Sequence, residues 1–147
     1  MIFFHIIRRL LSIMLLVFAS LELQAQEVNL RDVFRQMPDS ILPYLTETNR
    51  LDMMDFMDSH MKARVQNKFE GYSEMLALSD DSLTIQMSSM LRLTLRLVPV
   101  MDEIDGSRQL ICLERIVGKT AEIVHTTRTF YSVLWRKLEE ETWTLVK

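Results

Sequence analysis

The stretch that decides the fold is Leu91-Arg92-Leu93-Thr94-Leu95-Arg96-Leu97, in which every second residue is leucine. Successive side chains of a β-strand point to opposite faces, so a period of two predicts a strand with one buried face and one polar face. The same alternation over residues 83–87 and a β-like run over residues 109–117 predict two further strands. Asp105-Gly106, between the strand over residues 91–97 and the run over residues 109–117, is a strong signal for a hairpin.

Two more strand-like runs follow, over residues 121–126 and 130–138, and the second carries Tyr131, Val133 and Trp135 on one face. Four or five strands in succession, joined by short links, predict an antiparallel meander.

The N-terminal part of the chain has helical spacing instead. Apolar residues over 30–61 recur with a period near 3.6, interrupted at residues 37–40 and near Pro43. The clearest helix is expected to begin at Asn49 as the N-cap, with Asp52 at its N3 position. One arc of about 120° then holds several apolar side chains, namely Met53, Met54, Met57, Met61 and Val65. We therefore expect an α+β domain, with short N-terminal helices packed on one face of a four- or five-stranded antiparallel sheet.

The composition fits one ordinary domain, since 48 % of the 147 residues are hydrophobic and only three are glycine. The net charge of −3 argues against general binding of nucleic acid, which needs a basic face. Cys112 is the single cysteine, so neither an internal disulfide nor a structural zinc site with paired thiolates is expected.

The first 25 residues are typical of a secretory signal peptide. Arg8 and Arg9 precede an uncharged run over residues 10–21, which is followed by the small-residue ending Leu23-Gln24-Ala25. That run would cover about 18 Å as a helix, well short of a bilayer core of about 30 Å. We expect cleavage after Ala25, no stable membrane span after cleavage, and a single domain over residues 26–147.

Other candidate sites have simpler structural interpretations. Gly118-Lys119-Thr120 lacks the glycine five residues earlier that a phosphate-binding loop needs, because Leu113 stands there. The helical methionines share an arc with Val65 and are expected in the core, with Met54, Met57 and Met61 against the leucine face. No cofactor and no metal site is expected.

The face of the sheet turned away from the leucines is the predicted interaction surface. A three-residue loop at Ile104-Asp105-Gly106 would pair Glu103 with Ser107 and would place Arg96 opposite Glu114 and Val98 opposite Cys112. A two-residue loop would instead oppose Arg96 and Arg115, which is unfavourable. The predicted surface consists of Arg92, Thr94, Arg96, Cys112 and Glu114.

Two blocks near the N-terminus resemble a known family. They are Met37-Pro38-Asp39-Ser40-Ile41-Leu42-Pro43-Tyr44-Leu45 and Asn49-Arg50-Leu51-Asp52-Met53-Met54-Asp55-Phe56-Met57-Asp58, followed by Met61-Lys62-Ala63. On these residues the chain resembles an exported Bacteroidales family, the domain of unknown function 3256, over most of the mature chain. The resemblance supplies no established activity and no catalytic residue that could be carried over to this chain. It also implies longer chains with a second helix-and-sheet lobe, similar to tandem repeats of the β-lactamase-inhibitor type, of which residues 26–147 would form one lobe.

The expected function is that of an exported, non-catalytic binding or interaction domain of the bacterial cell envelope. We expect it to be periplasmic or secreted, with an envelope protein or glycan as its partner and no nucleic acid. Two alternatives stay open. An envelope hydrolase could draw its acid and base from residues far apart in sequence, such as Asp39, Asp58 and His125. Binding of a metal such as Cu(I) could use the methionine thioethers.

Overall fold

The computed structural model describes residues 28–119, 122–139 and 145. The predicted signal peptide, residues 1–25, lies outside this range.

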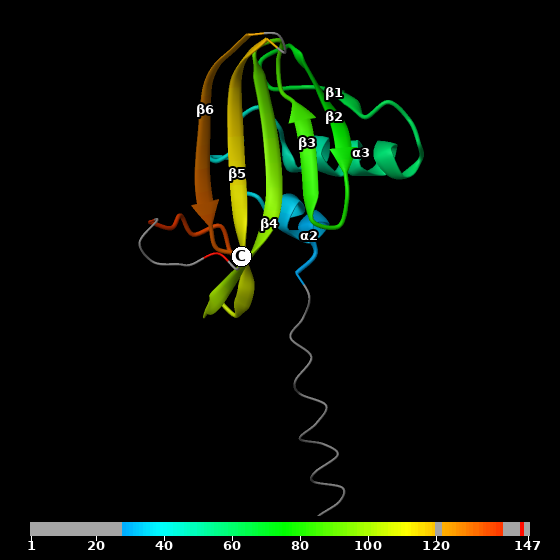
Figure 1. Ribbon diagram of the computed structural model, residues 1–147. Helices are drawn as coiled ribbons and strands as arrows, with labels where there is room; N and C mark the ends of the chain where they lie inside the picture. Colours follow the sequence, from blue (N-terminus) through cyan, green and yellow to red (C-terminus); the bar gives the residue numbers. More distant parts are fainter. Residues whose placement is uncertain (1–27, 120–121, 140–144, 146–147) are drawn as a thin grey trace, which may run out of the picture.

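One antiparallel sheet dominates the structure (Figure 1). Its strands lie in the order of the sequence, β1-β2-β3-β4-β5-β6, so each strand pairs with its neighbour along the chain. The predicted α+β class and antiparallel meander are confirmed, but the sheet has six strands where four or five were expected. The strands are β1 (Arg64–Gln66), β2 (Tyr72–Leu78), β3 (Ser82–Gln86), β4 (Leu91–Ile104), β5 (Ser107–Lys119) and β6 (Glu122–Tyr131).

The end of the sheet differs from the prediction. The runs over residues 121–126 and 130–138 were expected to form two strands, but residues 122–131 form the single strand β6. The strand ends at Tyr131 because the chain turns at residues 132–135, where Trp135 has a φ of 63°. This turn places the Trp135 indole against α2 (Leu30–Arg35), and its Nε1 donates a hydrogen bond of 2.9 Å to the Val33 carbonyl. The contact between Trp135 and α2 therefore outweighs the β-like pattern of residues 130–138.

The hairpin between β4 and β5 has a two-residue turn, and the predicted three-residue loop is wrong. Asp105 and Gly106 have φ values of 51° and 77°, and Ile104 pairs with Ser107. Positive φ at both central positions is what a type I′ turn requires, and its twist matches that of the strands.

The register then shifts. Five steps along β4 from Pro99 to Ile104 face only two steps along β5 from Ser107 to Gln109. Proline lacks the N–H that a ladder needs, so pairing is readily interrupted there. Beyond the irregular segment Arg96 lies opposite Cys112 and not opposite Glu114. The like-charge pairing that argued against a two-residue turn is avoided by this shift.

The helix α3 (Glu47–Asp58) begins three residues before the predicted start. Thr46 is the N-cap, and Asn49 is the N3 residue of a capping box in which each side chain binds the other residue's backbone N–H. The helix ends at Asp58, and His60 follows with a φ of 55°. Met61 therefore leaves the apolar arc, and its side chain is 58 % exposed.

The main core lies between the helices and the leucine face of the sheet. Leu93, Leu95 and Leu97 are buried as predicted. The helix α3 contacts β1 and β2, and α2 contacts α3. The segment between the helices reaches farther across the sheet, since Arg115 on β5 donates to the Ile41 carbonyl at 3.2 Å. Figure 1 shows both helices behind the sheet.

A second, smaller core lies on the other face of the sheet. It contains Val100, Leu110 and Leu138, with Val98 and Ile104 packed against it. Because Leu110 is paired with Val98, two residues from Arg96, this core closes one end of the face that carries the polar side chains.

Candidate functional site

The five predicted surface residues lie together on the outer face, by which we mean the sheet face opposite the leucines and the helices. Thr94 is paired with Glu114, and Arg96 is paired with Cys112. Arg92 lies one pleat further along β4, opposite Ile116. Arg96 is exposed, Arg92, Cys112 and Glu114 are half-buried, and Thr94 is 7 % exposed. The structure therefore places all five on one face, although the pairing within it differs from the prediction.

The registers of β3 to β6 arrange the outer face in three rows, each of which crosses four strands. The first row is Gln86, Arg92, Ile116 and Thr126. The middle row is Thr84, Thr94, Glu114 and Arg128. The third row is Ser82, Arg96, Cys112 and Phe130. Each row contains one arginine, and the three rows together contain one carboxylate.

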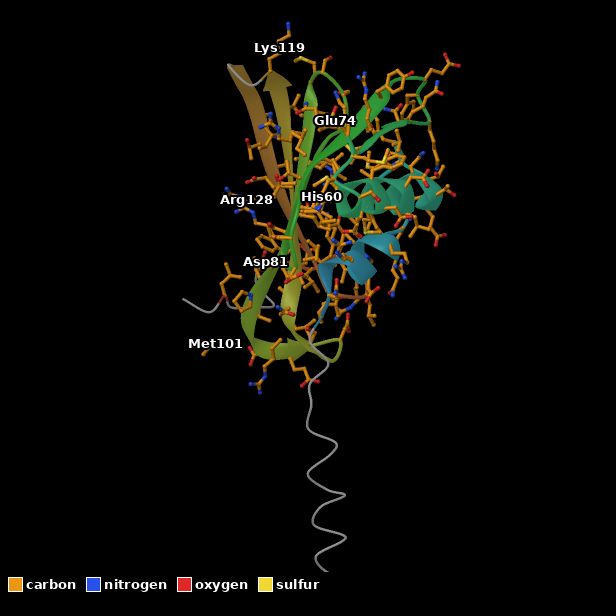
Figure 2. The ribbon with its side chains drawn as sticks, turned by 90° about the vertical axis from the view of Figure 1, so that its right-hand side faces the viewer. His60, Glu74, Asp81, Met101, Lys119 and Arg128 are labelled. Atoms are coloured by element: carbon orange, nitrogen blue, oxygen red, sulfur yellow. The ribbon has the colours of Figure 1, made fainter. Side chains whose placement is uncertain are left out.

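The carboxylate of Glu114 is paired with Arg128 on β6. Arg128 Nε donates to Glu114 Oε1 at 2.7 Å, and this contact raises the pKa of the guanidinium. Figure 2 shows Arg128 on the side of the sheet that faces away from the helices.

Sequence reasoning missed Arg128 because it fell in the gap between two predicted strands. The run Thr126-Thr127-Arg128-Thr129-Phe130, rich in β-branched residues, was the signal that could have joined them.

Neighbouring side chains hold the other polar residues in place. Arg92 Nε donates to Gln86 Oε1 at 3.1 Å. The hydroxyl oxygens of Thr84 and Thr94 lie 3.5 Å apart. These cross-strand contacts fix the polar side chains of the outer face, whereas the side chain of Arg96 is exposed to solvent. The outer face therefore combines ordered polar groups with two exposed guanidinium groups, those of Arg96 and Arg128.

Cys112 lies between Arg96 and Phe130 in the third row. Burial raises the pKa of its thiol. A thiol with a raised pKa is a weak nucleophile, since the thiolate is the reactive form. The position of Cys112 is therefore that of a packing residue within the outer face.

The residues of the alternative hydrolase make their contacts in three different places. Asp39 is bound by Lys68 at 3.0 Å and by Arg50 at 3.1 Å, and Asp58 is bound by Arg31 at 2.7 Å. His125 Nε2 lies 2.8 Å from the Thr127 hydroxyl. The hydrogen bond from Lys68 lowers the pKa of Asp39, and that from Arg31 lowers the pKa of Asp58. A carboxyl held ionised in this way is poorly suited to act as a general acid.

The methionines that were predicted to share one helical arc divide between core and surface. Met54 is buried as predicted, and Met57 packs against the main core. Met61 was expected beside them, and that prediction is wrong because the helix ends first. In the described part of the chain, no group of three or more His, Cys, Asp or Glu side chains is arranged to hold a metal ion.

Comparison with known proteins identifies a family and a similar fold, and neither match has a described activity. A family model described as "Protein of unknown function (DUF3256)" matches residues 20–147. No curated protein matches the chain. A solved structure, described as a domain of an uncharacterized protein from Porphyromonas gingivalis W83, matches with a TM-score of 0.60 and 24 % identity. The match covers 76 % of this chain and 54 % of that one, so this chain spans about half of its neighbour's length. Among the described residues, no helix is both long enough and apolar enough to cross a membrane.

Proposed function

The chain belongs to the family described as "Protein of unknown function (DUF3256)", and we propose that it is an exported, non-catalytic interaction domain of the bacterial cell envelope. Its binding surface is the outer face, centred on Arg92, Thr94, Arg96, Cys112 and Glu114, with Arg128 added from β6.

The charge of the outer face is the observation that supports this function. From β3 to β6 its three rows hold Arg92, Arg96 and Arg128 against the single carboxylate of Glu114, whereas the whole chain has a net charge of −3. The first row continues on β2 with Glu74, whose carboxylate is paired with Lys62 at 3.4 Å. A local excess of positive charge on an acidic protein attracts partners that carry anionic groups. An acidic protein surface or an acidic glycan of the envelope has this chemistry.

The outer face is also open and chemically mixed. In the described residues both helices lie on the opposite side of the sheet (Figure 2). Arginine beside half-buried apolar groups such as Cys112, Ile116 and Phe130 is a combination that protein interfaces favour. A partner could therefore bury apolar area while its anionic groups pair with the guanidinium groups.

Export supports an envelope partner. The basic start of the chain, its short apolar run and the Leu23-Gln24-Ala25 ending are the features that a signal peptidase recognises. We place the mature protein in the periplasm or outside the cell.

Site-specific crosslinking in the native envelope tests this function. A photo-crosslinking amino acid replaces Thr84, which lies on β3 at the end of the middle row, in three backgrounds. The first is otherwise wild type, and the second carries Arg92→Glu with Arg96→Glu. The third carries Arg35→Glu with Lys119→Glu, which changes the net charge equally at exposed positions outside the three rows. Thermal melting of each protein checks that it is folded.

The proposal expects one crosslinked partner in the first and third backgrounds and its loss in the second. Equal crosslinking in all three backgrounds, or loss in both charge-reversed backgrounds, would refute a role for the arginines of the outer face. Release of the partner by moderate salt would agree with an electrostatic contribution.

A further inference from the structure

The strand β6 is the long free edge of the sheet. It is 10 residues long and ends the strand order, whereas β1 at the other edge has three residues. An edge strand presents backbone N–H and C=O groups that can pair with another extended chain. Natural edges are usually protected by proline, lysine, a bulge or a covering segment.

The strand β6 has little of this protection. Its sequence, EIVHTTRTFY, contains neither proline nor lysine. Its register with β5 is regular from His125 to Tyr131 and shifts at the hairpin end, where Val117 pairs with His125 and Gly118 with Ile123. The side chains of residues 125–128 are exposed, so none of the described elements covers either face of the strand there.

The chain protects only one end of this edge. After the turn at residues 132–135 it returns beside β6, where Tyr131 pairs with Lys137 and Leu138 N donates to the Phe130 carbonyl at 3.0 Å. Successive residues of a strand direct their backbone groups to opposite sides. Thr126 and Arg128 therefore direct theirs to the same side as Phe130, away from β5. No strand of the described residues lies beside these two positions, and a groove lined by residues 127–130 and 137–139 runs along the edge.

We propose that β6 pairs in antiparallel fashion with β6 of a second copy of this chain, so that two sheets join into one across a two-fold axis at Thr126. The open stretch, residues 122–129, lies between the hairpin end of β6 and the return segment. Thr126 is the outward-directed residue nearest its middle. An axis there uses the open stretch of both copies and brings neither return segment into the pairing.

The side chains are compatible with this register. Thr126 lies opposite its own copy, and His125 lies opposite the second copy's Thr127. Threonine pairs across strands are favourable. Each Arg128 lies toward an opposite end of the contact and is already neutralised by Glu114 at 2.7 Å. A two-fold contact is the commonest way in which identical chains associate. The proposal concerns the edge of the sheet and is independent of the partner of the outer face.

Replacement of Thr126 by proline or by valine tests the pairing. Proline removes the outward N–H at a position that does not donate to β5, and edge strands tolerate it. Valine keeps both the N–H and the shape of threonine. Sedimentation velocity of protein purified from a host that expresses the full chain is measured across the micromolar range. Wild type and Thr126→Val should shift from monomer to dimer with rising concentration, and Thr126→Pro should stay monomeric.

Disulfide trapping provides a readout that does not depend on the proline variant. In a Cys112→Ser background, Thr126→Cys should form a covalent dimer on mild oxidation, and Ser89→Cys, in an exposed turn, should not. A wild-type protein that is monomeric throughout the range, a dimer that survives Thr126→Pro in a folded protein, or equal trapping at both cysteines would each overturn the proposal.

Discussion

The buried guanidinium of Arg50 and the exposed carboxylate of Asp39 form an ion pair with a separation of 3.1 Å between Nη1 and Oδ1. The Arg50 side chain is 3 % exposed and that of Asp39 is 54 % exposed. Arg50 also donates to the backbone carbonyls of Leu45 and Arg35, each at 3.3 Å. One side chain of α3 therefore fastens both ends of the segment that connects the two helices.

We expect Arg50→Ala to lower the free energy of unfolding by about 2–4 kcal/mol, because two carbonyls that Arg50 satisfies lose their donor. Lys68→Ala removes the other cation bound to Asp39 but leaves both carbonyls satisfied, and it should cost about 0–1 kcal/mol. Urea denaturation measures both variants. Equal losses would show that the ion pair, and not the carbonyl contacts, is what Arg50 contributes.

The pair between Glu114 and Arg128 can be tested by exchange. Glu114→Arg alone places two guanidinium groups opposite each other on β5 and β6, and it should cost roughly 0.2–1 kcal/mol. The double change Glu114→Arg with Arg128→Glu restores opposite charges and should recover most of that loss. Denaturant titration of the wild type, both single variants and the double variant gives the coupling energy. A coupling energy of zero would contradict a stabilising pair.

Two methionines of similar sequence context should differ strongly in their contribution to stability. Met54 is 4 % exposed, so Met54→Ala should cost about 2–5 kcal/mol through lost burial and a residual cavity. Met61 is 58 % exposed, so Met61→Ala should change stability by no more than about 0.5 kcal/mol. Thermal melting in metal-free buffer distinguishes the two. A large loss in Met61→Ala would place that residue in the core after all.

Acid sensitivity should depend on the pair of Arg31 and Asp58. Arg31 holds the pKa of Asp58 below its ordinary value of 3.8. A carboxyl whose pKa is lower in the folded state than in the unfolded state stabilises the fold at pH values above its unfolded-state pKa. This stabilisation is lost as the pH falls through the folded-state pKa. Asp58→Asn and Arg31→Met should therefore each reduce the slope of unfolding free energy against pH below about pH 4. Urea denaturation at a series of pH values measures this slope. An unchanged slope in both variants would exclude the linkage.

The N-terminus of the exported protein is expected at or near Gln26. The basic start, the short apolar run and the Leu23-Gln24-Ala25 ending favour cleavage there. Mass spectrometry of protein from a suitable bacterial host measures the terminus directly, and Ala25→Tyr, which disfavours cleavage at this position, serves as the control. Recovery of intact Met1 in the membrane fraction of the wild type would rule out the prediction.

The short elements β1 and β2 show where pattern reasoning fails. With three residues, β1 is too short to display a period of two, and the irregular pairing between Met75 and Ala77 interrupts the alternation of β2. Alternation in the sequence could therefore not identify β1 and β2. They form strands because each pairs with a neighbouring strand. The helix α3 was recognised, but its end at Asp58 was not, and the error for Met61 follows from that.

The sequence by itself determined which face of β4 is buried, because alternation is a property of one strand and needs no partner. Leu93, Leu95 and Leu97 accordingly lie in the core, and Arg92, Thr94 and Arg96 lie together on the outer face. Only the tertiary structure decided which residues oppose each other, because register depends on the turn and on every irregularity between the turn and the pair. The register shift between Pro99 and Ile104 places Arg96 opposite Cys112, and the formation of β6 places Arg128 opposite Glu114.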